Sequence, residues 1–388
     1  MYSVTGRSRW VGPPAPSDQP HPATGKEDRF DQRSGPVELP RPWRKEVSAQ
    51  RRPRIVVTGA GGFIGHHLVT SLKQRGYWVR GVDLHLPEYT AVDADEFELR
   101  DLRRFDECLL ATRGVDHVYA LAADMGGMGF ISANHATIHR NNALINIQTL
   151  EAARLNGASR YLFSSSACVY PEHLQSAADV TPLKEDDAYP ANPQDAYGWE
   201  KLTAERLCLD YFREYQLETR IVRFHNIYGP YGTYDGGREK VPAALCRKVA
   251  AAKPGGDVEI WGDGEQTRSF CYVDDCVEGI YRLMQSDYRK PLNLGSEEMV
   301  TVNALADMII ALSGKGDLAL RHVDGPQGVR GRNSDNRRLR KVLDWEPSIT
   351  LSQGLEPTYR WIEKQVESGR PPGSTTPGRA VDRPSERA

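Results

Sequence analysis

The chain has 388 residues, of which 39% are hydrophobic and 26% are charged, and its formal net charge is −2. These values are ordinary for a globular protein, and the near-neutral charge argues against a surface devoted to binding polyanions. No run of about 18 apolar residues occurs, so we expect no membrane span, and the N-terminus lacks the apolar core of a signal peptide. The six cysteines form no C-x-x-C pair. We therefore expect no metal site, no dense disulfide framework and a cytoplasmic protein.

The two ends of the chain differ from its middle. Residues 1–52 are rich in proline, arginine, aspartate and serine and lack periodic apolar spacing, a composition that predicts a disordered extension. Residues 367–388 are predicted to form a second disordered tail. The first tail is mildly basic, but it lacks a basic surface studded with aromatic residues, so we expect no nucleic-acid partner.

Strands and helices alternate through residues 53–225. Short apolar runs predict strands at 54–58, 78–82, near 97, 115–121 and 161–164. The spacing of apolar residues predicts helices at 63–72 and at about 132–157. This alternation is typical of βαβ units around a parallel sheet that is covered on both faces.

We therefore predict an α/β fold in which residues 53–225 form a Rossmann-type, doubly wound parallel sheet. Residues 226–366 contain shorter, mixed elements. They are predicted to form mainly a smaller C-terminal α/β substrate-binding lobe, with some later segments returning to the first domain.

A glycine-rich turn joins the first predicted strand to the first predicted helix. Its sequence is Gly59-Ala60-Gly61-Gly62-Phe63-Ile64-Gly65. Glycines allow the backbone to approach a pyrophosphate, and the start of a helix offers free N–H groups and a favourable dipole. The turn therefore predicts a dinucleotide site formed by Gly59, Gly62, Phe63, Ile64 and Gly65, although a tight turn without a ligand has the same pattern.

Two aspartates follow the next two strands. Asp83 ends the second strand, where its carboxylate can accept the ribose hydroxyls of NAD and would repel the 2′-phosphate of NADP. Asp101 follows the third strand and could contact the adenine edge. Capping a helix explains either aspartate as well. We predict NAD as the cofactor.

Three residues form a candidate catalytic group. Ser166 closes the fifth strand, at the carboxyl edge where such sheets bind ligands. Tyr197 and Lys201 lie four positions apart, on one face of a predicted helix. An ammonium beside the phenol stabilises the phenolate, so Tyr197 could accept a hydroxyl proton while a hydride passes to NAD.

These features together resemble the extended short-chain dehydrogenase/reductases, the family of sugar-nucleotide epimerases and dehydratases. Within that family the chain is similar to the GDP-mannose 3,5-epimerases over residues 53–366. The motifs that carry this closer resemblance are Asp124–Gly129, Ser166–Pro171, Gly236–Lys240, Gln266–Phe270 and Val329–Asn336.

The resemblance implies a reaction and a set of residues. Transient oxidation at C4 acidifies the hydrogens on C3 and C5, and Cys168 and Lys240 look like the acid and base that epimerise these carbons. The substrate implied is GDP-mannose and the products are GDP-L-galactose and GDP-L-gulose, formed by a homodimer. The substrate contacts implied are Gly127, Ser166, Ala167, Cys168, Asn226, Glu239, Lys240, Lys248, Gln266, Thr267, Arg268 and Arg330.

For several of these residues, a purely structural role without catalysis or substrate binding also stays open. Cys168 could be an ordinary buried strand cysteine, and Lys240 a solvated surface lysine. Arg268 and Arg330 suit a diphosphate, but either could form an ordinary surface ion pair.

Alternative functions also stay open. The enzyme could epimerise C3 or C5 alone, or it could resemble GDP-L-fucose synthase, which reduces its product with NADPH. Asp83 and the Gly236–Lys240 motif argue against the latter. A non-catalytic, NAD-sensing protein would be expected to have lost Tyr197 or Lys201, and both are present.

Overall fold

A computed structural model describes residues 51–326 and 328–369. The disordered extension predicted for residues 1–52 and the tail predicted for 367–388 lie outside these residues, except for their innermost positions. The described residues belong to one compact unit.

The centre of the fold is a parallel sheet of seven strands in the order β11-β6-β5-β4-β1-β2-β3. Strand order reverses between β1 and β4, which is the point where doubly wound sheets bind ligands at the carboxyl ends of their strands. The strands are β1 (Arg54–Thr58), β2 (Trp78–Asp83), β3 (Glu96–Leu99), β4 (His117–Ala120), β5 (Arg160–Ser166), β6 (Glu218–Phe224) and β11 (Pro291–Leu294). The predicted α/β fold with a doubly wound parallel sheet is confirmed.

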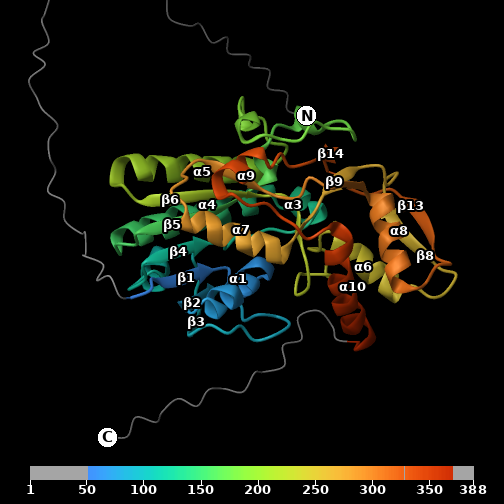
Figure 1. Cartoon of the computed structure of the whole chain (residues 1–388), viewed down its shortest axis with the longest axis horizontal. Coiled ribbons are helices and arrows are strands. Elements are labelled where there is room, and N and C mark those ends of the chain that lie inside the picture. Colours follow the sequence, from blue (N-terminus) through green and yellow to red (C-terminus); the bar gives the residue numbers. More distant parts are fainter. Residues whose placement is uncertain (1–50, 327, 370–388) are drawn as a thin grey trace, which may run out of the picture. The chain divides into compact units, whose positions relative to one another are not determined.

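Both faces of the sheet are covered, and successive residues of β1 show how. Ile55 and Val57 belong to a core cluster with the apolar residues of α1 (Phe63–Gln74) and α7 (Val273–Gln285). Val56 belongs to a second cluster, which α2 (Phe105–Ala111), α4 (His135–Leu155) and α5 (Ala196–Tyr215) complete. Alternate side chains of a strand point to opposite faces, so the sheet lies between these two layers of helices (Figure 1).

One predicted helix is divided. In place of a single helix at 132–157, the chain forms α3 (Met128–Ala133) and then α4, with Asn134 between them. Asn134 has φ −135° and ψ 31°, outside the helical range, and its side-chain amide donates to the carbonyl of Phe130. Apolar spacing continues through this break, which is why the pattern did not reveal it.

The C-terminal part contains three small sheets. β7 (Ile227–Tyr228) pairs with β10 (Cys271–Tyr272), and β8 (Asp257–Trp261) pairs with β13 (Ala319–Val323). β9 (Thr267–Ser269) lies between β12 (Met299–Thr301) and β14 (Gly331–Arg332). Three helices pack together beside them, namely α6 (Val241–Ala251), α8 (Val302–Ser313) and α10 (Leu351–Glu367) (Figure 1).

Later segments also return to the large sheet. β11 adds to its edge beside β6, α7 covers one face, and α9 (Arg337–Leu343) packs against β11 and α7. The C-terminal sequence therefore contributes both to the small sheets and to the main one.

Cysteines, metal ligands and membrane spans can be assessed for the described residues. All six cysteines are free thiols, and Cys168 alone among them is not fully buried. No group of three or more histidine, cysteine, aspartate or glutamate side chains in these ranges could hold a metal ion. None of the described helices has the length and apolar character needed to cross a bilayer.

Candidate active site

The turn between β1 and α1 requires its glycines. Gly59 has φ +73°, and a Cβ there would lie 2.9 Å from the backbone nitrogen of Ala122. A Cβ on Gly65 would overlap the carbonyl oxygen of Gly59. Helix α1 begins after Gly62, which has no side chain to cap it, so the first N–H groups face outward with the positive end of the helix dipole. This cradle fits a dinucleotide pyrophosphate, in which Gly59, Gly62, Phe63, Ile64 and Gly65 would hold NAD.

Asp83 accepts a hydrogen bond from the backbone of that turn. Its Oδ2 accepts the N–H of Gly61 at 3.0 Å, and its Oδ1 accepts the N–H of His85 at 3.2 Å. A carboxylate oxygen can accept more than one hydrogen bond, so capacity remains for ribose hydroxyls. This role of Asp83 stays a prediction.

Asp101 forms an ion pair with Arg103. Nε and Nη2 of Arg103 donate to its two oxygens at 2.8 and 2.7 Å, and these hydrogen bonds lower the pKa of the Asp101 carboxyl. Its predicted contact with adenine remains untested.

Ser166, Tyr197 and Lys201 come together where β5 meets α5. Nζ of Lys201 donates to the carbonyl of Ser164 at 2.9 Å and lies 5.5 Å from the centroid of the Tyr197 ring. Ser166 lies close enough to the Tyr197 phenol to oppose, by hydrogen bonding, the rise in the pKa of that phenol that burial causes. Helix α5 is fixed at its start because Oδ1 of Asp195 accepts the N–H of Gly198 at 2.8 Å.

Burial opposes ionisation of both Tyr197 and Lys201. Desolvation raises the pKa of Tyr197 well above its ordinary value, and the nearby Cys168 and Glu200 add to this effect. Desolvation also lowers the pKa of the Lys201 ammonium, against the opposing charge of Glu200. Tyr197 is therefore a neutral phenol in the free protein, and it needs further positive charge beside it to act as a base.

Lys240 lies within electrostatic range of Cys168. Cys168 is in the 3₁₀ turn η1 (Ala167–Val169) and is half-buried. Lys240 immediately precedes α6 and is exposed. Desolvation by the surrounding protein lowers the pKa of the Lys240 ammonium even so, and Cys168 opposes this shift. Cys168 thus packs beside Tyr197, and Lys240, which is far away in the sequence, lies within electrostatic range of Cys168.

The Lys240 loop packs against the glycine-rich segment after β4. The N–H of Gly127 donates to the carbonyl of Arg238 at 3.1 Å. A Cβ on Gly127 would lie only 2.5 Å from the carbonyl oxygen of Glu239. Gly127, Glu239 and Lys240, three of the predicted substrate contacts, therefore lie at one junction that admits no larger residue at position 127.

Four other predicted substrate contacts are held by backbone carbonyls. Asn226 has φ +47°, and its Nδ2 donates to the carbonyl of Ser269 at 2.9 Å. Lys248 donates to Glu259, Gln266 to Trp261 and Thr267 to Ala178, at 2.8, 3.1 and 2.5 Å respectively. Their contacts with substrate stay predictions, as does that of Ala167, which is buried in η1.

Three arginines lie in or beside the β9–β14 sheet, and their surroundings differ. Arg330 forms a two-point ion pair with Asp263 at 2.7 and 2.9 Å. Arg268 donates to the carbonyls of Thr267 and Val329, and burial lowers the pKa of its guanidinium. Arg332 contacts Cys168 directly, with 3.5 Å between Nη1 and Sγ. The sequence gives no sign of the role of Arg332, because its pattern cannot show which of two arginines separated by one glycine faces the site.

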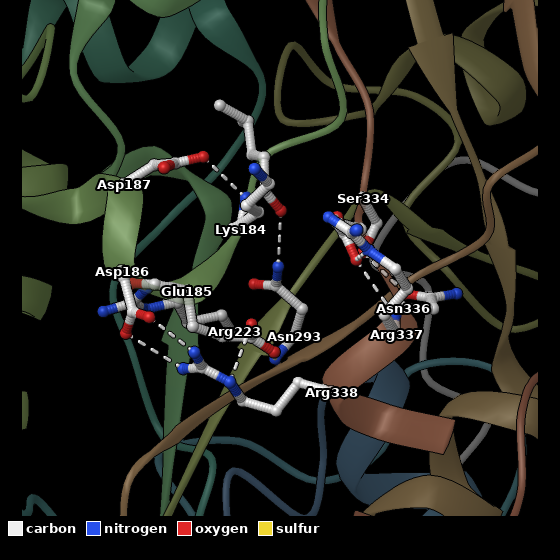
Figure 2. Close-up of polar contacts among 12 residues, drawn as sticks. Lys184, Glu185, Asp186, Asp187, Arg223, Asn293, Ser334, Asn336, Arg337 and Arg338 are labelled. Carbon is white, nitrogen blue, oxygen red and sulfur yellow. Dashed lines mark hydrogen bonds and ion pairs between the residues drawn. The ribbon is translucent and has the colours of Figure 1, made fainter. Parts of the chain in front are cut away.

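A buried polar network supports the segments around the site. Arg223 on β6 and Glu205 on α5 form an ion pair at 2.7 Å whose side chains are 1% and 2% exposed. Figure 2 shows its continuation towards the 3₁₀ turn η3 (Glu185–Ala188): Arg338 reaches from α9 to Asp186, with 2.6 Å between Nη2 and Oδ2. Nδ2 of Asn293 on β11 donates to the carbonyl of Leu183 at 2.8 Å. These contacts fix the loop before α5 to the main sheet.

Comparison with known proteins identifies the class. The model of the NAD dependent epimerase/dehydratase family matches residues 55–295. The solved UDP-glucose 4-epimerase of Thermotoga maritima with UDP-glucose has a TM-score of 0.72 at 26% identity and covers 81% of this chain and 99% of that one. UDP-glucuronic acid 4-epimerase of Bacillus cereus, in complex with UDP-glucuronic acid and NAD, has a TM-score of 0.69 at 27% identity, covering 80% and 99%.

The chain belongs to the NAD-dependent epimerase/dehydratase family and is an NAD-dependent nucleotide-sugar epimerase. Its more specific relatives are plant proteins named GDP-mannose 3,5-epimerase. The one from Arabidopsis thaliana is 51% identical over 323 residues, 83% of this chain and 85% of the relative. The one from Oryza sativa subsp. japonica is 50% identical over 332 residues, 85% and 87%. The resemblance to this group, inferred from the motifs, is confirmed.

Proposed function

We propose that the enzyme converts GDP-mannose to GDP-L-galactose and GDP-L-gulose by epimerising C3 and C5. The observation that carries this proposal is that Cys168 packs beside Tyr197 and lies within electrostatic range of Lys240. A C4 epimerase needs only the tyrosine, lysine and serine, whereas inversion at C3 and C5 also needs an acid and a base next to the ring. The names of the plant relatives support the same substrate.

Tyr197, Lys201 and Ser166 would prepare C4. NAD, when bound, would supply a reversible hydride acceptor for C4 and a positive ring that favours ionisation of the Tyr197 phenol. Tyr197 would accept the C4 hydroxyl proton, Ser166 would hold the same oxygen, and the Lys201 ammonium would stabilise the phenolate. The C4 ketone makes the hydrogens on C3 and C5 acidic.

Cys168 and Lys240 would then move protons at C3 and C5. One of them accepts the proton from carbon, and the C–H electron pair enters the enolate of the 4-keto sugar. The other donates a proton to the opposite face of the same carbon, so the configuration inverts and no net oxidation occurs. A thiol and an amine whose pKa is lowered by its surroundings suit proton transfer near neutral pH.

The remaining predicted contacts would hold the GDP portion of the substrate. Arg268 and Arg330 have guanidinium groups that match the geometry of a diphosphate. Lys248, Gln266 and Thr267 lie on the neighbouring α6 and β9 or directly before it. Asn226, Gly127 and Glu239 would line the sugar.

The test is solvent exchange during turnover in deuterated water, using wild-type enzyme, Cys168→Ala and Lys240→Ala. We expect wild-type enzyme to place deuterium at C3 and C5, as NMR of the product would show. Both variants should still bind GDP-mannose and accumulate reduced nicotinamide, but they should exchange deuterium at least about 100-fold more slowly. Exchange at only one carbon would indicate a single-site epimerase. Wild-type exchange rates in both variants would overturn the roles of Cys168 and Lys240.

We also propose that the enzyme is a cytoplasmic homodimer that associates through α4 and α5. These helices pack side by side and expose Ile147 and Trp199 by 51% and 42%. Apolar side chains exposed together on two packed helices would provide the apolar patch that a contact surface needs. Free thiols throughout agree with a reducing compartment. Light scattering should give twice the chain mass for wild-type protein and a monomer for Ile147→Glu; a monomeric wild type would refute the dimer.

A further inference from the structure

Arg332 makes two contacts that link Cys168 to a buried glutamine. Its Nη1 donates to Sγ of Cys168 at 3.5 Å, and its Nε donates to Oε1 of Gln175 at 2.5 Å. Gln175 ends the 3₁₀ turn η2 (Glu172–Gln175) and is 1% exposed. A guanidinium that is held on one side by a buried amide can present its other side to the sulfur in a fixed orientation.

The orientation of the Gln175 amide follows from its other contacts. Its Nε2 donates to the carbonyls of Tyr170 and Pro171 at 3.1 and 3.2 Å. Turning the amide over would place its oxygen against two carbonyl oxygens, so Oε1 must face Arg332. The fixed Oε1 of Gln175 therefore requires a hydrogen-bond donor opposite it, and the Arg332 guanidinium is such a donor.

The backbone around Arg332 is also fixed. β14 pairs in parallel with β9, with Arg332 opposite Arg268. A Cβ on the preceding Gly331 would overlap the carbonyl oxygen of Ala177. Directly after Arg332, the carbonyl of Asn333 accepts the N–H of Leu183 at 3.1 Å, and the N–H of Asp335 donates back to Leu183 at 3.1 Å. Figure 2 shows this segment, with Ser334 and Asn336, beside Lys184.

The charged groups around Cys168 are mostly positive. Besides Arg332 they are Arg268 on β9, Lys240 before α6, and Lys201 on α5, while Tyr197 is neutral. Within residues 51–326 and 328–369, no carboxylate forms an ion pair with Arg332. An ionised sulfur would be the nearest counter-charge for its guanidinium, and hydrogen bonds with a charged partner are the stronger ones.

We propose that Arg332, oriented by Gln175, is a positioning residue that holds the Cys168 sulfur and favours its ionised form before substrate binds. The proposal deepens the proposed function and rests on Cys168 acting as an acid or base there. The thiolate then offers a sulfur lone pair to the proton of C3 or C5. Arg332 keeps all its protons, since a guanidinium does not deprotonate in proteins, and nothing is oxidised or reduced.

Alkylation of the native protein by iodoacetamide, without substrate, tests this directly. The sulfur lone pair forms the S–C bond and iodide leaves, so the rate reports ionised sulfur. The other five cysteines are buried, and peptide mass spectrometry confirms the modified residue. We expect Arg332→Gln to slow alkylation near pH 7 by about tenfold and to move the rate–pH profile to higher pH. Arg332→Lys should restore part of the rate.

Two further variants complete the experiment. Gln175→Met keeps the length of the side chain but accepts no hydrogen bond from Arg332, so it should shift the profile in the same direction by a smaller amount. It also serves as the test if Arg332→Gln fails to fold. Arg337→Gln makes the same change in net charge at an exposed arginine paired with Asp335, and its profile should match that of the wild type.

The outcomes separate this proposal from the proposed function. A wild-type alkylation profile in folded Arg332→Gln, together with a raised KM for GDP-mannose, would mean that Arg332 serves the substrate only, and the proposal fails. A wild-type profile in Gln175→Met would remove Gln175 from it. A shifted profile in an enzyme that places no deuterium at C3 or C5 would leave the Arg332–Cys168 pair intact and refute the epimerase mechanism.

Discussion

The dinucleotide-binding half and the C-terminal half build their functional groups in different ways. Around the large sheet each group is set by nearby sequence: the Gly59–Gly65 turn is continuous, and Tyr197 and Lys201 share one helix. In the C-terminal half Arg268 and Arg332 lie on strands of three and two residues, and Lys240 lies directly before α6. Arg332 meets Gln175 and Cys168 across 157 and 164 positions. The cofactor site is thus a local property of the sequence, whereas the site for the sugar exists only once the chain has folded.

The largest expected effect is the loss of activity in Tyr197→Phe, a change in the dinucleotide-binding half that should leave stability unchanged. Tyr197→Phe removes only the phenolic oxygen, so activity should fall by about 10²- to 10⁴-fold, which is the usual contribution of general acid–base catalysis. NAD binding and the melting temperature should stay close to those of the wild type. Steady-state kinetics, NAD titration and thermal unfolding check this. Tyr215→Phe, at the exposed end of the same helix, is the matched control and should keep full activity.

The next effect concerns the buried ion pair between Arg223 and Glu205. Glu205→Gln leaves the guanidinium without its countercharge in a site where both side chains are almost fully buried. Breaking such a pair costs about 3–5 kcal/mol in the free energy of unfolding, which the urea midpoint would report. Asp106→Asn breaks the exposed pair with Arg104 and should leave the midpoint unchanged. If both variants unfold at the wild-type midpoint, the network does not stabilise this half.

The same difference between the two halves explains which features could be predicted from the sequence. The strands at 54–58, 78–83 and 160–166 contain clusters of apolar and aromatic residues, so the sequence locates them to within a few positions. The glycine turn and the Tyr197–Lys201 pair are visible because their spacing carries the geometry. Local pattern cannot show that Gly127 packs on Glu239, because that contact depends on two loops brought together by the fold. The break between α3 and α4 at Asn134 could not be predicted either, because the apolar spacing continues through it.

Arg330 and Arg332 illustrate the limit most clearly. Both belong to one motif, and the family resemblance implied Arg330 as a substrate contact. In the structure Arg330 is paired with Asp263, and Arg332 faces Cys168. Two residues of the same type, separated by Gly331, differ because of partners that lie far from both of them in the sequence. Chemistry of this kind can be assigned only from the folded chain.

The smallest expected effect tests whether Arg330 serves the substrate from its present position. Its guanidinium is held by Asp263, with 2.7 Å between Nη1 and Oδ1, on an exposed surface. If Arg330 must leave Asp263 to bind the diphosphate, Asp263→Asn should lower the KM for GDP-mannose, but by less than about fivefold, because exposed ion pairs hold their partners weakly. The turnover number should not change, since neither residue contacts Cys168 or Tyr197. Asp257→Asn removes one of the two carboxylates that pair with Arg321, on the paired strands β8 and β13, and provides the control, with an unchanged KM. A higher KM in Asp263→Asn would mean that Asp263 holds Arg330 in its binding position, and an unchanged KM would make Arg330 an ordinary surface ion-pair arginine.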